Sequence, residues 1–157
     1  MALPDLGGKT AVVTGASRGI GEHLARDFTG RGMRLGLCAR SIPALPEGER
    51  VLARRLDVRD ADAVDQFASD VEERFGRIDL WINNAGILNP ITSLRRAPVA
   101  EWNRHIQINV SGVFHGTRAY IQHLRRLGAP GRGGVLVNIS SGAARSPYAG
   151  WSAYCAS

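Results

Sequence analysis

The stretch Thr10-Ala-Val-Val-Thr-Gly-Ala-Ser-Arg-Gly-Ile-Gly21 decides the fold, because it joins a run of β-favouring residues to a glycine-rich turn. After it, apolar residues recur at helical spacing as far as about Arg31. A strand, a glycine-rich turn and a helix in this order predict a phosphate-binding turn, in which glycine lets the backbone approach a pyrophosphate at the positive end of the helix. The spacing is GxxxGxG rather than GxGxxG, so an ordinary strand-to-helix turn is the competing interpretation.

Apolar runs and amphipathic stretches alternate along the rest of the chain, which is typical of βαβ units around a parallel sheet. We therefore predict an α/β fold with a parallel sheet covered by helices on both faces. The third strand is expected near an edge. The expected strands are 10–14, 33–39, 50–56, 78–82 and 134–139, and the later helices are about 60–75 and about 99–127.

Two connections are expected to be irregular. The long helix at about 99–127 is predicted to kink near Ser111-Gly112. Between the second and third strands only Arg40 to Glu49 remain, and Pro43 and Pro46 interrupt them, so we expect a single irregular turn of helix there.

Composition excludes several classes of protein. Hydrophobic residues at 44% and charged residues at 22% are ordinary for a globular domain. No apolar run approaches the roughly 20 residues of a membrane-spanning helix, and residues 1–8 do not read as a secretory signal. A cytoplasmic location and no membrane contact are expected. Cys38 and Cys155 form no CxxC pair, so we expect two buried thiols, no disulfide and no metal site.

The formal net charge of +6 raises the question of nucleic-acid binding. The 20 basic residues are one lysine, Lys9, and therefore 19 arginines, and these are scattered among acidic residues. This pattern favours a solvated surface, with part of the positive field serving a phosphorylated ligand. Nucleic-acid binding is not expected.

The residue after the second strand bears on the choice of dinucleotide. Folds that bind NAD place an acid there, on the adenosine ribose, whereas this chain has Arg40. A guanidinium would make charge-assisted hydrogen bonds to a 2′-phosphate, worth about 1.5 to 3 kcal/mol. Arg18, inside the glycine-rich turn, can approach the same phosphate. We predict NADP(H) rather than NAD(H); the competing interpretation is that both arginines point to water.

Five motifs together resemble the short-chain dehydrogenase/reductase family in sequence, order and spacing, and they cover essentially the whole chain. They are Thr14-Gly-Ala-Ser-Arg-Gly-Ile-Gly21, Asn83-Asn-Ala-Gly86, Ile108-Asn-Val-Ser-Gly112, Asn138-Ile-Ser-Ser141 and Tyr154-Cys-Ala-Ser157. The stretch from Asn138 to Ser157, especially Gly150-Trp151, is similar to the benzil reductase and sepiapterin reductase branch, which acts on dicarbonyl or side-chain ketones.

The resemblance implies a single domain over residues 1–157 with a Rossmann-type doubly wound parallel sheet of strand order 3-2-1-4-5. It implies an enzyme that transfers hydride between nicotinamide and a carbonyl or alcohol. It implies that Tyr154 is the general acid, that Ser141 holds the substrate oxygen and that Asn109 holds a water in the proton relay. It also implies that Asp57 and Val58 meet the adenine. The remaining implied cofactor-binding positions are Gly15, Ser17, Arg18, Gly19, Ile20, Gly21, Arg40, Asn83, Asn84, Ala85 and Gly86. The last four of them would line the adenosine side and brace the central sheet.

Each catalytic assignment has a competitor. Ser140 could replace Ser141, although alternation along a strand turns it the other way. Tyr148 is a second tyrosine in the same loop. The side chain of Asn109 could serve only as a structural hydrogen-bonding group inside its helix. Trp151 could stack on an aromatic substrate or simply pack. Three histidines of the long helix have no paired carboxylate motif, so we expect surface or packing roles for His105, His115 and His123.

The family motif is YxxxK, and this chain reads Tyr154-Cys-Ala-Ser157 and stops. We therefore expect a C-terminally truncated piece of a longer enzyme, without the last strands and helices of the family fold. The full-length enzyme is expected to be a homo-oligomer that acts on a small-molecule ketone, diketone or alcohol. The alternative is a catalytically inactive dinucleotide-binding fragment that lacks the active-site lysine, since Lys9 precedes the first strand.

Overall fold

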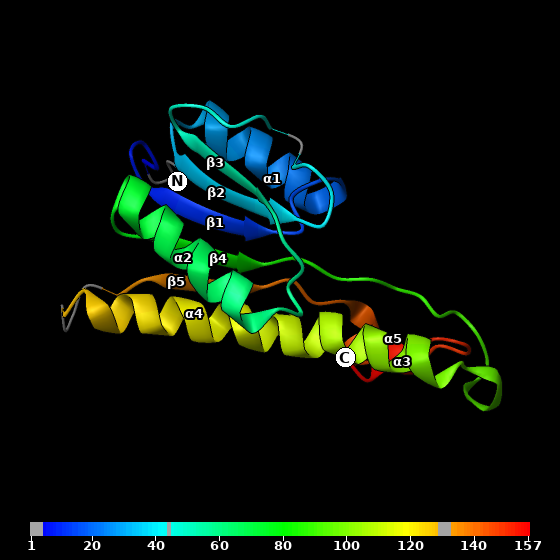
Figure 1. Ribbon diagram of the computed structural model, residues 1–157. Coiled ribbons are helices and arrows are strands. Elements are labelled where there is room, and N and C mark those ends of the chain that lie inside the picture. Colours follow the sequence, from blue (N-terminus) through cyan, green and yellow to red (C-terminus); the bar gives the residue numbers. More distant parts are fainter. Residues whose placement is uncertain (1–4, 44, 129–132) are drawn as a thin grey trace.

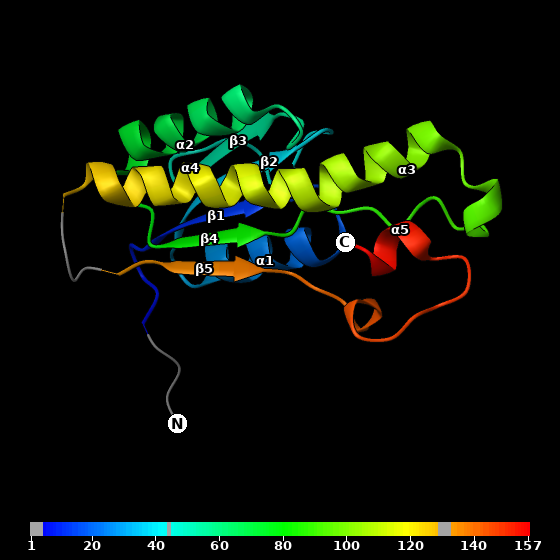
Figure 2. The ribbon, with the colours of Figure 1, turned by 90° about the horizontal axis from the view of Figure 1, so that it is seen from below.

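The computed structural model describes residues 5–43, 45–128 and 133–157, so the opening residues 1–4 lie outside it. Its centre is a five-stranded parallel sheet of order β3-β2-β1-β4-β5 (Figures 1 and 2). The fold class, the strand order and the edge position of the third strand are confirmed. The strands are β1 (Thr10–Thr14), β2 (Arg34–Ala39), β3 (Val51–Arg55), β4 (Leu80–Asn83) and β5 (Val135–Asn138).

Helices cover both faces of the sheet. Figures 1 and 2 show α2 and α4 on one face and α1 on the other. The core is accordingly split in two: Val12 of β1 belongs to the cluster under α2 and α4, while its neighbours Ala11 and Val13 belong to the cluster under α1. The helices are α1 (Gly19–Gly30), α2 (Ala61–Phe75), α3 (Val99–Ile106), α4 (Gly112–Arg126) and α5 (Ser152–Cys155), with 3-10 turns η1 (Leu94–Arg96) and η3 (Gly142–Ala144).

The predicted long helix is continuous but contains one wider turn. Between α3 and α4 the backbone forms a π-helical turn, η2 (Gln107–Ser111), and the flanking cap residues Ile106 and Gly112 keep helical dihedral angles. The irregularity therefore starts earlier than the predicted kink at Ser111-Gly112. A π-turn bulges the helix and changes which side chains share its inner face.

The predicted turn of helix between β2 and β3 is wrong for the described residues 41–43 and 45–49, which contain no helix. Ala44 lies outside the described residues. The connection ends in an antiparallel bridge between Gly48 and Val51. Pro43 and Pro46 lack the backbone N–H groups that a helical turn needs, and this short segment offers few residues to replace them.

The two edges of the sheet differ. Val51 and Leu52 of the edge strand β3 are buried, whereas Val135 of β5 is 57% exposed. Lys9 lies just before β1, where its ammonium is 3.9 Å from the carboxylate of Asp79. This is the end of the sheet opposite the carboxyl ends of the parallel strands.

The two cysteines differ in burial. Cys38 of β2 is buried as expected, but Cys155 of α5 is only partly buried, so that part of the expectation is wrong. Burial raises the pKa of Cys38 to about 12, against a smaller lowering by a hydrogen bond from the backbone of Gly15. Within the described parts of the chain, no helix has the length and apolarity to cross a bilayer. The same residues contain no cluster of potential metal ligands.

Candidate active site

The glycine-rich turn opens onto a cavity of about 490 Å3, here called the glycine-turn cavity. It lies at the carboxyl ends of β1, β2 and β4, where the strand order reverses and where α/β sheets bind ligands. Its lining includes every predicted cofactor-binding residue except Gly21 and Asn83. These lining residues are Gly15, Ser17, Arg18, Gly19, Ile20, Arg40, Asp57, Val58, Asn84, Ala85 and Gly86.

Close packing explains two of the glycines. Gly15 has φ of +69°, and a Cβ there would lie 2.7 Å from the Cα of Ala85. A Cβ on the buried Gly21 would lie 2.5 Å from the carbonyl oxygen of Gly15 and 2.6 Å from Nδ2 of Asn84. Gly21 therefore lets α1 approach the turn, and it does not line the cavity.

Thr14, at the end of β1, ties the turn to β4, a role that sequence reasoning did not assign. Its Oγ1 accepts hydrogen bonds of 3.0 Å from the backbone N–H groups of both Asn84 and Ala85. Nδ2 of Asn84 in turn donates to the carbonyl oxygens of Thr14 (2.9 Å) and Gly15 (3.2 Å). The signal in the sequence was a polar residue that follows two valines and directly precedes the glycine-rich turn.

The charged residues that line the glycine-turn cavity are Arg18, Arg40 and Asp57. Asp57 is already paired, because its Oδ2 accepts from Nη2 of Arg59 at 2.7 Å and from Nε at 3.0 Å. The hydrogen bonds from Arg59 lower the pKa of Asp57, with a smaller electrostatic contribution from Arg40, and burial only partly opposes them. Arg18 and Arg40 are exposed cavity residues, and neither guanidinium makes a hydrogen bond or ion pair with a described residue.

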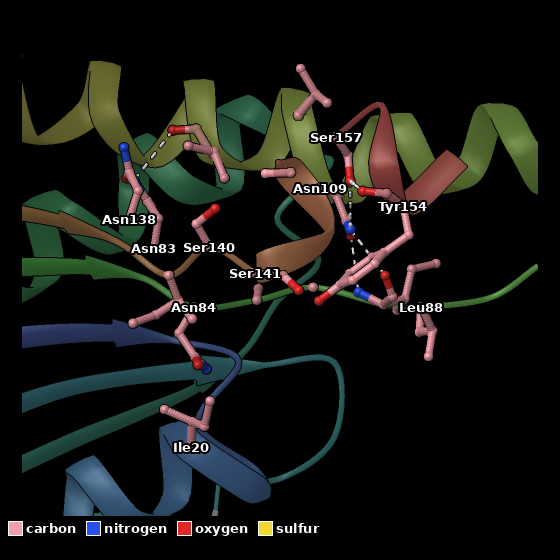
Figure 3. Close-up of a pocket in the computed structure, with 17 residues that line it drawn as sticks. Ile20, Asn83, Asn84, Leu88, Asn109, Asn138, Ser140, Ser141, Tyr154 and Ser157 are labelled. Atoms are coloured by element: carbon pink, nitrogen blue, oxygen red, sulfur yellow. Dashed lines mark hydrogen bonds between the residues drawn. The ribbon is translucent and has the colours of Figure 1, made fainter. Parts of the chain in front are cut away.

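A second cavity of about 490 Å3, here called the tyrosine cavity, brings together Tyr154, Ser141 and Asn109 (Figure 3). Figure 3 shows the hydroxyls of Ser141 and Tyr154 turned toward one another. Oγ of Ser141 also accepts a 3.2 Å hydrogen bond from the backbone N–H of Ala143, which fixes it at the start of η3. Ser140 lines the same cavity, but in Figure 3 the hydroxyl that faces Tyr154 is that of Ser141.

Asn109 sits in the π-turn and is held from outside its own helix. Its Oδ1 accepts from the backbone N–H of Ile87, and its Nδ2 donates to the carbonyl oxygen of Ile87, both at 2.9 Å. The competing interpretation, a hydrogen bond inside a helix, also describes part of the geometry, because Nδ2 lies 3.0 Å from Nε2 of His105 one helical turn earlier.

The two cavities adjoin, because five residues line both: Ile20, Asn84, Ala85, Gly86 and Ile87. Asn83 lies in the wall of the tyrosine cavity only. Its buried amide accepts from Nε1 of Trp81 and donates to Oδ1 of Asn138, both at 2.9 Å. Asn83 thus joins β4 to β5 instead of lining the glycine-turn cavity.

The remaining competitors are placed as follows. Tyr148 is half-exposed and lines neither cavity, while Trp151 packs between the rings of Tyr148 and Tyr154. His105 and His123 are fully buried. Nδ1 of His123 lies 2.9 Å from Oε2 of Glu72 on α2, a partner that no sequence motif indicated.

A family model described as short chain dehydrogenase matches residues 9–157. The chain is 37% identical to the 3beta-hydroxysteroid dehydrogenase 1 of Eggerthella lenta, over 98% of this chain and 60% of that protein. It is 35% identical to a sorbitol dehydrogenase of Cereibacter sphaeroides, over 96% of this chain and 59% of that protein. The chain thus spans about 60% of the length of these curated relatives.

Two solved structures of short-chain dehydrogenases resemble this chain in fold. A short-chain dehydrogenase/reductase from Serratia marcescens superimposes with a TM-score of 0.82 at 28% identity, covering 98% of this chain and 67% of that one. A short-chain dehydrogenase from Streptomyces avermitilis gives a TM-score of 0.82 at 34% identity, covering 94% of this chain and 55% of that one.

Proposed function

The chain belongs to the short-chain dehydrogenase/reductase family of oxidoreductases. From this we propose that it contains the coenzyme-binding residues and the catalytic residues of an NADP(H)-dependent enzyme. The proposed reaction interconverts a ketone or diketone and the corresponding alcohol. One observation carries the proposal: the tyrosine cavity, with Tyr154, Ser141 and Asn109 in its wall, adjoins the cavity formed by the glycine-rich turn.

The residues present fit a nicotinamide dinucleotide. A Cβ at Gly15 or Gly21 would clash with neighbouring backbone atoms, so glycine at both positions lets the turn pack closely against β4 and α1. The glycine-turn cavity is left open beside it. When bound, the nicotinamide donates or accepts a hydride. The preference for NADP(H) is supported by Arg18 and Arg40, which have no described partner, and by Asp57, whose negative charge Arg59 already offsets.

The side chains of the tyrosine cavity would transfer a proton to or from the substrate oxygen. In the reducing direction, the hydroxyl of Tyr154 gives its proton to the carbonyl oxygen of the substrate, as a general acid. Because Oγ of Ser141 accepts from Ala143, its own O–H can donate to the same substrate oxygen. Asn109, held by Ile87, would keep a water in place behind them.

A dinucleotide-binding role without turnover is the second candidate. The family motif pairs its tyrosine with a lysine, and the one lysine of this chain, Lys9, lies beside Asp79 at the opposite end of the sheet from the cavities. Among the described residues no lysine therefore adjoins Tyr154. Turnover of a diketone with NADPH separates the two candidates, because binding without turnover supports only the second.

The substrate is a proposal drawn from sequence. The curated relatives are named for different substrates, a 3beta-hydroxysteroid and sorbitol among them, so they do not single out the benzil and sepiapterin reductase branch. That branch, a cytoplasmic location and a homo-oligomeric full-length enzyme all stay predictions.

Replacing Arg40 by aspartate tests the coenzyme proposal. Fluorescence titration of the wild-type chain should show tighter binding of NADPH than of NADH. In Arg40→Asp, loss of a charge-assisted hydrogen bond should weaken NADPH binding by about 10- to 150-fold, with a smaller effect on NADH. Arg95→Asp, an exposed arginine of η1 that lines neither cavity, is the matched control. Equal losses for both coenzymes would reject the NADP(H) assignment, and no binding of either would reject the dinucleotide site.

A further inference from the structure

A fully buried histidine, His105 of α3, lies one helical turn before Asn109 and beside Tyr154. Its Nδ1 is 2.8 Å from the carbonyl oxygen of Asn89, and its Nε2 is 3.0 Å from Nδ2 of Asn109. Nε2 is also 3.2 Å from Oγ of Ser157, in the turn that ends α5. The imidazole meets the ring of Tyr154 edge to face, with the ring centroids 6.0 Å apart.

The partner of Nδ1 fixes the tautomer of His105. A carbonyl oxygen only accepts hydrogen bonds, so Nδ1 must carry the hydrogen that is donated to Asn89. A neutral imidazole has one N–H group, and Nε2 is therefore a lone pair that accepts.

Asn109 leads to the same tautomer independently. Since the backbone N–H of Ile87 must meet an oxygen and its carbonyl must meet an N–H group, the amide of Asn109 can be oriented in one way only. That orientation places Nδ2, a donor, against Nε2 of His105. Two donors would repel each other there, so Nε2 has to be the acceptor.

We propose that His105, as the neutral Nδ1–H tautomer, is a positioning residue that holds Asn109 and the α5 turn bearing Tyr154 in one arrangement. The proposal rests on the proposed function to the extent that Asn109 and Tyr154 take part in catalysis. His105 gives the amide of Asn109 a partner besides Ile87. The amide of Asn109 in turn donates to Oγ of Ser157 at 3.2 Å, and this hydroxyl donates to the carbonyl oxygen of Tyr154 at 3.1 Å. His105 also contacts the ring of Tyr154, which holds α5 against α3, two elements that lie side by side in Figure 2.

The first test needs neither coenzyme nor substrate. Long-range 1H–15N NMR of the histidine rings in the wild-type chain should show the Nδ1–H tautomer for His105. In His105→Phe, whose ring keeps the edge-to-face contact, exchange of the Asn109 side-chain amide protons with solvent should accelerate about tenfold, the equivalent of one hydrogen bond. In His105→Gln the slow exchange should return, because glutamine can accept from an asparagine one turn later.

His115→Phe is the matched control, since this histidine of α4 also bonds a backbone carbonyl, that of Val58, through Nδ1. It should leave the Asn109 amide unchanged. An Nε2–H tautomer in the wild-type chain would overturn the proposal whether or not the variants fold. Equal exchange rates in folded His105→Phe and in the wild type would also overturn it.

The second test measures the steady-state kinetics of the variants. His105→Phe should lower kcat for diketone reduction by about 10- to 100-fold, the usual scale for a misplaced catalytic group, with KM for NADPH changed less than twofold. His105→Gln should recover most of kcat. A parallel loss in kcat and a rise in KM for NADPH, without rescue by glutamine, would mean general disruption and would overturn the positioning role. An absence of all turnover would count against the proposed function, while the NMR test still decides the role of His105.

Discussion

Asn83→Ala is expected to destabilise the fold by about 2 to 4 kcal/mol, because the amide of Asn83 serves several buried partners at once. Asn83 is 3% exposed, and its Oδ1 accepts from the indole N–H of the fully buried Trp81. Its Nδ2 donates to Thr117 of α4 at 3.1 Å and to Asn138 of β5 at 2.9 Å. A Cβ at Gly116 would overlap Oδ1, so α4 packs directly on this amide.

The magnitude follows from which groups lose a partner. The indole N–H of Trp81 would be buried without an acceptor, at a cost of about 1 to 3 kcal/mol. Asn138 is exposed and Thr117 is partly exposed, so water would replace most of their lost hydrogen bonds, leaving about 1 kcal/mol from them. Such a loss is a large share of the roughly 5 to 15 kcal/mol that holds a typical domain folded.

Urea unfolding followed by far-UV circular dichroism measures this loss, with Asn103→Ala on the exposed face of α3 as the control. The control should shift the free energy of unfolding by less than about 0.5 kcal/mol. A double-mutant cycle with Trp81→Phe should show a coupling of at least about 1 kcal/mol, since phenylalanine has no N–H to leave unpaired. A cost for Asn83→Ala below about 1 kcal/mol, or an additive cycle, would refute the reasoning.

Two further predictions concern ionisable groups. Burial raises the pKa of Glu72, but hydrogen bonds from Arg126 and His123 outweigh it and hold that pKa below its ordinary range. The resulting stabilisation is complete above about pH 4.3 and is lost as the pH falls through the lowered value. Urea unfolding should therefore show Glu72→Gln less stable than the exposed control Glu73→Gln at pH 7, with the gap closing toward pH 3; a gap independent of pH contradicts this. Since its pKa is raised to about 12, Cys38 should resist iodoacetamide at pH 7.5 until urea unfolds the chain, whereas Cys155 reacts in the folded state, as intact mass would show.

Local sequence pattern was enough to predict much of the fold. The strands of the sheet are short apolar runs, and the turn after β1 is rich in glycine, so their positions follow from neighbours in the sequence. The order of the strands was predicted from the family resemblance of the five motifs, since local pattern alone does not give the order of strands in a sheet. The conformation of the connection from Arg40 to Glu49 was not predictable, because its prolines disfavour a helix without specifying which other conformation the segment takes.

The motifs of the chain were enough to predict the family, the parallel sheet and many of the residues around the two cavities. Only the tertiary structure decided which partner each polar side chain takes: Asn84 bonds Thr14 across 70 positions, and His123 bonds Glu72 across 51. It likewise gave the partners through which Asn83 braces the sheet, Trp81 and Asn138, and it set His105 against Asn109 in a π-turn. The physical reason is that periodicity and turn chemistry act over a few residues, whereas a buried hydrogen bond depends on which distant segments the packed core brings together.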